Sequence, residues 1–131
     1  MSRPVVEYPD AVWVAVEYLR GVLDAPVYSR VPESRPPAFV RVRRVGGLVL
    51  DVVRDRPRLD VHFWGPTEEA AEALMRRGRA FLLAMAGTRG DTTAYRVREV
   101  GGPQWLPDPE SGQPRYAAAF EMSLRGRELE I

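Results

Sequence analysis

The sequence predicts an α+β fold with a mainly antiparallel sheet, two helices packed on one face of the sheet and a projecting β-hairpin. Two segments carry apolar residues at helical spacing, and several others alternate apolar and polar residues as strands do. Most of these segments are joined by short breaks containing glycine or proline, which favour antiparallel neighbours. At 131 residues, the chain suits one domain, residues 1–131, built around one core.

The first predicted helix covers residues 11–23. Asp10 stands before it as the N-cap, because a carboxylate there accepts hydrogen bonds from the free amides of the first turn. Pro26 follows its end. Its apolar residues form one stripe that a sheet would cover: Val12, Val16, Leu19 and Leu23. We also expect Trp13 in the core.

Two strands are expected next, on either side of a proline-rich turn. Residues 27–31 form a short strand candidate, and the turn covers residues 31–37. Alternation then predicts a strand over residues 38–45, with Val40 and Val42 on one face.

A hairpin follows from the glycine pair in the next segment. Gly46 and Gly47 are expected to break the strand, and residues 48–53 return as another strand. Residues 41–53 would then form the projecting hairpin or a long ribbon. Residues 58–64 alternate once more and predict a further strand.

The second predicted helix starts after Thr67, which can act as its N-cap. Glu68 and Glu69 lie in its first turn, where the helix dipole favours negative charge. Gly87 is the expected stop signal. The apolar face of this helix consists of Ala70, Leu74, Phe81, Leu82 and Met85.

Residues 95–100 and 116–124 are the last predicted strands, and residues 101–114 are expected to form a long loop between them. Four prolines in that segment oppose both a helix and a central strand. Trp105 and Leu106 have two interpretations. They present a stiff apolar anchor to a neighbouring surface, or they fold back onto the core of their own domain.

The composition excludes several classes of function. No cysteine is present, so disulfides and thiolate metal sites are absent, and His62 is the only histidine. No apolar run reaches the roughly 18 residues of a membrane span, so we expect synthesis in the cytoplasm and no membrane contact. His62 shares a strand face with Asp60 and Trp64, but no nucleophile, phosphate loop or metal spacing accompanies it. We therefore expect a packed or interface histidine, no catalytic residue, no metal and no cofactor.

The charge is balanced as a whole but clustered locally. The net charge is +1, and all nineteen basic residues are arginine. Seven arginines fall between Arg35 and Arg58, against two acids. Codon bias in a GC-rich genome accounts for the preference of arginine over lysine, so the preference alone does not indicate selection for bidentate contacts.

Three segments resemble the tail terminator proteins of long-tailed phages and prophages of high-GC Gram-positive hosts. They are VPESRPPAFVRVRRVGG at residues 31–47, LDVHFWG at residues 59–65 and GGPQWLPDPESGQPRY at residues 101–116. The resemblance covers nearly the whole chain, and the third segment is the most specific. Family members often carry an acidic residue in the second segment, where this chain has His62 and Phe63.

The resemblance implies a structural virion protein rather than an enzyme. Such a protein forms a ring, expected to be a hexamer, that caps the tail tube, stops its polymerisation and joins it to the head. The expected partners are identical copies, the major tail tube protein and the head–tail connector, at the tail–neck junction of the virion. Two alternatives are another head-completion or neck protein and, less favoured, an arginine-rich nucleic-acid-binding module.

In that interpretation the hairpin and the proline-rich loop supply the subunit and partner contacts. The candidate interface residues are Arg41, Arg43, Arg44, Trp105, Leu106, Pro107, Asp108 and Arg115. Arg115 is expected to pair with Asp108 or Glu110 of its own or a neighbouring chain. For the arginines of the hairpin three roles remain open: a solvated strand face, ion pairs to a neighbouring subunit, and contact with DNA that passes through the ring.

Overall fold

The computed structural model describes residues 3–89 and 91–130, which form two helices and eight strands. The helices are α1 (Ala11–Val22) and α2 (Glu68–Leu83). The strands are β1 (Val6–Glu7), β2 (Val27–Tyr28), β3 (Phe39–Asp51), β4 (Arg54–Trp64), β5 (Gly87–Arg89), β6 (Thr92–Trp105), β7 (Arg115–Arg125) and β8 (Arg127–Glu128).

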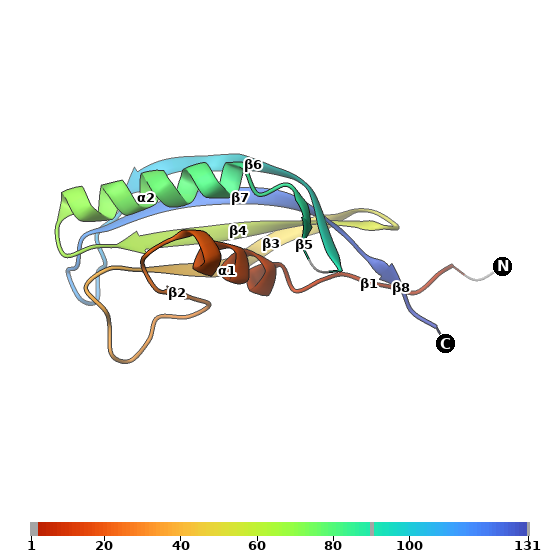
Figure 1. The fold of residues 1–131 in the computed structure, drawn as a ribbon, viewed down its shortest axis with the longest axis horizontal. Helices are drawn as coiled ribbons and strands as arrows, with labels where there is room; N and C mark the ends of the chain where they lie inside the picture. The colour runs from red at the N-terminus through yellow and green to blue at the C-terminus, as the bar shows by residue number, and fades with distance from the viewer. Residues whose placement is uncertain (1–2, 90, 131) are drawn as a thin grey trace.

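Six strands make one sheet in the order β2-β3-β4-β7-β6-β5, and both helices lie on one face of it (Figure 1). Every neighbouring pair is antiparallel except β2 and β3, which run parallel over a short stretch. The predicted α+β class, with its mainly antiparallel sheet, is confirmed. The two short terminal strands β1 and β8 pair with each other outside the main sheet, and neither is among the predicted strands.

The core lies between the helices and the helix-facing side of β3, β4 and β7. Direct register partners point to the same side of an antiparallel pair, so Val42, Val61 and Ala118 form one buried row across the three strands. α1 covers this layer through Ala15, Val16 and Leu19, and α2 through Ala71, Met75 and Leu82. The hydroxyl of Tyr18 ties the helices together by donating to the carbonyl of Phe81 over 2.6 Å.

Both predicted helix starts are confirmed. The side chain of Asp10 accepts a hydrogen bond from the amide of Trp13, and that of Thr67 accepts one from the amide of Ala70. The end of the second helix differs from the prediction, because α2 stops at Leu83 and the amide of Ala84 already turns back to the carbonyl of Phe81. Gly87 instead opens β5 with a positive φ.

Trp13 corrects one core prediction. Its side chain is 57% exposed, because it lies on the side of α1 that faces away from the sheet. One position after Val12 is about 100° around the helix, so only the stripe that includes Val16 and Leu19 reaches the core.

The hairpin is longer than predicted. Gly46 and Gly47 do not end the strand, since β3 continues to Asp51 and the chain reverses at Val52 and Val53. The register between β3 and β4 shifts between Arg44 and Gly47, and the two glycines form this irregular part of the strand. Both have a positive φ, which glycine adopts at little cost, so the pair forms a bulge rather than a turn.

The proline-rich segment is shorter as a loop than predicted. Residues 101–105 belong to β6, and only residues 106–114 connect it to β7. Pro103 is tolerated because it lies at a register shift on the side of β6 where β5 no longer pairs. The expected strand over residues 27–31 is likewise reduced to the two residues of β2.

Candidate functional site

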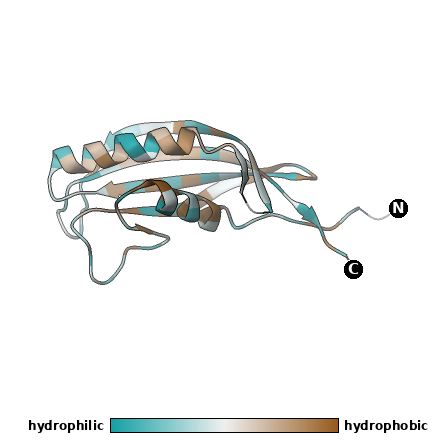
Figure 2. Ribbon diagram, viewed as in Figure 1, coloured by the Kyte–Doolittle hydropathy of each residue, from teal (hydrophilic) through white to brown (hydrophobic). Residues whose placement is uncertain are grey.

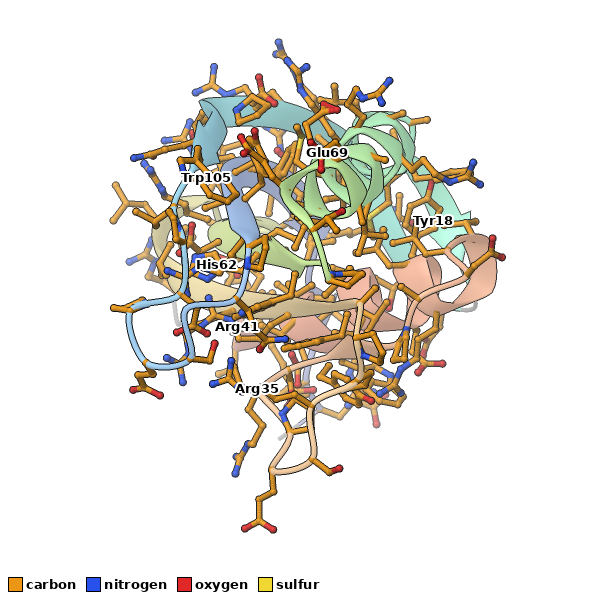
Figure 3. All side chains as sticks on the ribbon, turned by 90° about the vertical axis from the view of Figure 1, so that its left-hand side faces the viewer. Tyr18, Arg35, Arg41, His62, Glu69 and Trp105 are labelled. Atoms are coloured by element: carbon orange, nitrogen blue, oxygen red, sulfur yellow. The ribbon has the colours of Figure 1, made fainter. Side chains whose placement is uncertain are left out.

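The face of the sheet away from the helices is rich in arginine. Strand alternation and register place arginines of four strands on it, among them Arg41, Arg43, Arg54, Arg56, Arg58, Arg96, Arg98 and Arg115. We call these eight residues the arginine face. Three carboxylates lie among them, Asp51, Asp60 and Glu121. Figure 3, viewed from the end of the sheet, shows Arg41 and His62 on this side and Tyr18 on the helix side.

Half of the arginine face has an ion-pair partner. Arg54 pairs with Asp51 at 2.6 Å, and both Arg56 and Arg98 pair with Glu121 at 3.2 and 3.1 Å. Arg41 lies 4.0 Å from Asp60. No carboxylate within the described part of the chain pairs with the other four, Arg43, Arg58, Arg96 and Arg115. The face therefore carries a local excess of positive charge that the net charge of +1 conceals.

The floor between these arginines is made of small residues. Ala117 and Ala119 of β7 point to this side and lie beside Gln104 and Gly101 of β6. A Cβ on Gly101 would meet the Cβ of Ala119 at 3.3 Å and the guanidinium of Arg58 at 3.9 Å. The side chain of Arg58 thus reaches from β4 across β7 towards β6, and a larger floor residue would displace it.

A buried polar cluster closes one end of this face. His62 is 8% exposed, and its Nε2 lies 3.2 Å from Oδ2 of Asp60. The hydrogen bond with His62, followed by the charges of His62, Arg41 and Arg58, holds the pKa of Asp60 below its usual value despite partial burial. Burial lowers the pKa of Arg41, and the neighbouring charges of Arg43 and Arg115 act in the same direction.

Asp108, a candidate residue of the proline-rich loop, is buried and is hydrogen-bonded to Arg35 and Trp64. We call these three residues the clamp. Its Oδ2 accepts hydrogen bonds from Arg35 at 2.6 Å and from the indole of Trp64 at 2.9 Å, and its Oδ1 accepts one from the amide of Glu110 at 2.9 Å. Burial acts to raise the pKa of Asp108, but the hydrogen bonds from Arg35, Trp64 and the backbone outweigh it, so the pKa lies far below its ordinary value. The clamp fixes the 106–114 loop to β4 and to the loop before β3.

Arg115 does not pair with either predicted carboxylate of its own chain. Asp108 and Glu110 are instead contacted by Arg35, at 2.6 and 3.9 Å. The Nε of Arg115 donates to the carbonyl of Leu106 over 2.8 Å, and its guanidinium lies 5.5 Å from the centre of the Trp64 ring. It therefore braces the base of the loop.

The three remaining loop candidates are solvent-facing. Trp105 is 42% exposed and Leu106 is 39% exposed, while Pro107 is exposed beside them. The ring of Trp105 packs against Tyr116, with 5.2 Å between the ring centres. One side of the Trp105 ring packs on its own domain and the rest faces solvent, and its contact with a neighbouring surface stays a prediction.

Arg44 lies apart from Arg41 and Arg43. It pairs with Leu59 in the register, which places it on the opposite side of the ribbon. There its guanidinium contacts both oxygens of Asp55, at 2.9 and 3.3 Å, and Asp55 is 3% exposed. Arg44 thus neutralises a buried carboxylate of its own hairpin.

The tip of the β3-β4 hairpin is apolar and uncovered. Its exposed aliphatic side chains are Val45, Leu48, Val49, Leu50, Val52 and Val53, with Leu48 the most exposed at 71%. Figure 2 shows apolar residues along this tip, at the same end of the sheet as the two termini. The 106–114 loop lies at the other end (Figure 1).

The sheet also has two long free edges. β2 covers β3 only at Val40 and Arg41, and β5 covers β6 only from Thr92 to Ala94. Among the described residues, no strand pairs with the outer side of β3 from residue 42 to 51 or of β6 from residue 95 to 105. Unpaired edges of this length present rows of amides and carbonyls to another strand.

No protein-family model and no curated protein sequence matches this chain. Within residues 3–89 and 91–130 no group of three or more His, Asp or Glu side chains is placed to hold a metal ion, and neither helix is long and apolar enough to cross a membrane.

Part of the arginine face is not predicted from the sequence. Arg54, Arg56 and Arg58 occupy alternate positions of β4, but the strand predicted over residues 58–64 includes only Arg58. Arg96 and Arg98 join them only through the register of β6 with β7, which a single sequence does not contain.

Proposed function

We propose that this protein is a tail terminator, a ring of identical subunits that caps a phage tail tube and provides the surface for joining the head. The observation that carries the proposal is the pair of free edges on β3 and β6. The resemblance of residues 31–47, 59–65 and 101–116 to the terminator family supports the same conclusion.

The free edges have the directions that a closed ring needs. The four long strands alternate in the order β3-β4-β7-β6, so β3 and β6 run in opposite directions. The β6 edge of one copy therefore meets the β3 edge of the next as an antiparallel pair, with every copy oriented alike. A contact between two different surfaces of one protein closes into a ring when the rotation per subunit allows it.

The two ends of the strands then become the two faces of the ring. One face displays the apolar hairpin tips with Leu48 and Val52. The other displays the clamped loop with Trp105 and Leu106. Two chemically different faces suit a terminator, because one must bind the last tube ring and the other must bind the head connector without accepting another tube subunit.

Engineered cysteines test the edge contact, since the native chain has none. We expect a variant with Val45→Cys on β3 and Val100→Cys on β6, treated with a short bismaleimide, to give a ladder of covalent multimers that ends at a closed ring. Each single variant is the matched control and stops at the dimer. Dimers alone from the double variant would contradict the head-to-tail arrangement.

A polymerisation assay separates a terminator from a neck protein. Added to purified tail tube protein during assembly, a terminator shortens the tubes and is seen by electron microscopy at one end only. If the rings form but leave tube length unchanged, the ring belongs to another part of the head–tail junction.

A further inference from the structure

We infer that the arginine face binds the phosphate backbone of double-stranded DNA, without regard to base sequence. The inference deepens the proposed ring, and it rests on that ring only for the position of the face along a channel. Direct binding to DNA is a property of the face itself.

The charge of this face is available to a ligand. Arg43, Arg58 and Arg96 have no carboxylate partner in the described chain, and Arg43, Arg58, Arg96 and Arg98 are exposed. They come from three different strands, which spreads them over a surface that strand spacing makes roughly 15 Å wide. Guanidinium groups bind phosphate oxygens through paired N–H donors, and each phosphate neutralised releases counterions from DNA.

The shape of the face favours a duplex backbone over other acidic ligands. Its floor is low between the arginines, because Ala117, Ala119 and Gly101 carry small side chains or none. Single strands are held by several exposed aromatic rings. On this side Phe39 and Trp64 are buried, and Tyr95, beside Arg96, is 44% exposed. Protein interfaces are centred on apolar and aromatic residues, whereas the exposed Leu48, Leu50 and Tyr95 of this side lie towards its hairpin end.

The helix layer decides where this face lies in a ring. Both helices cover one side of the sheet, and a layer packed about 10 Å from the sheet needs a larger circumference than the sheet itself. The helices therefore lie on the outside of a closed ring, and the arginine face, on the opposite side of the sheet, lines the channel. In the proposed ring, every copy then presents its arginines to DNA that passes from head to tail.

Fluorescence anisotropy with a labelled duplex of about 30 base pairs tests the inference. We expect the triple variant Arg43→Gln, Arg58→Gln, Arg96→Gln to bind at least about tenfold more weakly than the native protein at 50 mM salt. The slope of log K against log salt should fall by about 0.9 for each arginine–phosphate pair that the substitutions remove. The matched control, Arg20→Gln, Arg76→Gln, Arg77→Gln, removes the same charge from the helix side and should bind within about twofold of the native protein.

Native mass spectrometry of the same samples separates this inference from the proposed ring. A ring that does not bind the duplex, or equal losses in the two triple variants, overturns the inference and leaves the ring in place. Face-dependent binding by a protein that forms no ring supports the inference and overturns the ring. Polyglutamate and unlabelled DNA are compared as competitors for the labelled duplex, with their concentrations expressed as negative charge. If polyglutamate displaces the duplex at the lower concentration, the inference is overturned and the face binds an acidic protein instead.

Discussion

The indole Nε1 of Trp64 donates a hydrogen bond to Oδ2 of Asp108 over 2.9 Å, although the two residues are 44 positions apart. The same oxygen accepts a hydrogen bond from Arg35. One carboxylate therefore joins β4, the loop before β3 and the loop between β6 and β7. Because Asp108 is 4% exposed, its partners are held in place without competition from water.

Replacing Asp108 with Asn should destabilise the protein by about 2–4 kcal/mol, because it removes the hydrogen-bonded charge partner of the partly buried Arg35 guanidinium. Chemical denaturation of the two proteins at pH 7 measures the difference. Glu110→Gln is the control, since Glu110 is exposed and lies 3.9 Å from Arg35, and it should change the stability by under ~0.5 kcal/mol. Equal effects would mean that the clamp contributes little to the fold.

The same carboxylate makes stability depend on pH in the acid range. The pKa of Asp108 is lowered in the folded protein, so its contribution is complete above the unfolded value of about 3.9 and is lost as the pH falls towards the folded value. The stability difference between the native protein and Asp108→Asn should therefore shrink steadily below about pH 4. Asp60, whose pKa is also lowered, leaves the variant with some acid sensitivity. Urea unfolding at stepwise lower pH tests this, and a constant difference would argue against an ionised Asp108.

Arg43 and Arg44 are neighbours in sequence but should respond differently to the same change. Arg44→Gln removes the partner of the buried carboxylate of Asp55 and should cost about 1–3 kcal/mol. Arg43→Gln removes an exposed side chain that forms no ion pair within the described chain and should stay within about 0.5 kcal/mol of the native protein. Thermal melts of the two variants give the comparison. A stability loss for Arg43→Gln equal to that of Arg44→Gln would contradict the placement of the two side chains on opposite sides.

The bulge in β3 makes Gly47 more sensitive to substitution than Gly21. Its φ of 98° is strained for any other residue, and an added Cβ would run into the backbone of Arg56 and Pro57, so Gly47→Ala should cost about 2 kcal/mol or more. Gly21→Ala is a fitting control, because Gly21 lies in α1 with nothing within 4 Å of an added Cβ. That change should stabilise the protein by about 0.5–1 kcal/mol.

Truncating Trp105 and Leu106 to Ala should affect assembly more than folding. Both side chains are about two-fifths exposed. The variant monomer therefore loses only the packing of Trp105 on Tyr116 and a small part of its buried apolar surface. We expect a folded variant by circular dichroism that no longer binds its partner ring, because aromatic anchors dominate interface energies. A melting temperature that falls steeply would show that the loop belongs to the core.

The α+β class, both helix starts and the apolar rows of the sheet follow from the sequence alone. Those features depend on contacts between residues a few positions apart, such as Asp10 with the amide of Trp13. They also depend on the regular spacing of apolar residues along a helix or strand that has one buried face. The course of β3 through Gly46 and Gly47 depends on its register with β4, because a glycine pair is compatible with both a turn and a bulge. The partner of Asp108 and the grouping of Arg58 with Arg96 and Arg98 likewise depend on the folded chain. Contacts between residues far apart in the chain depend on strand order and register, and periodicity within one segment carries no information about either.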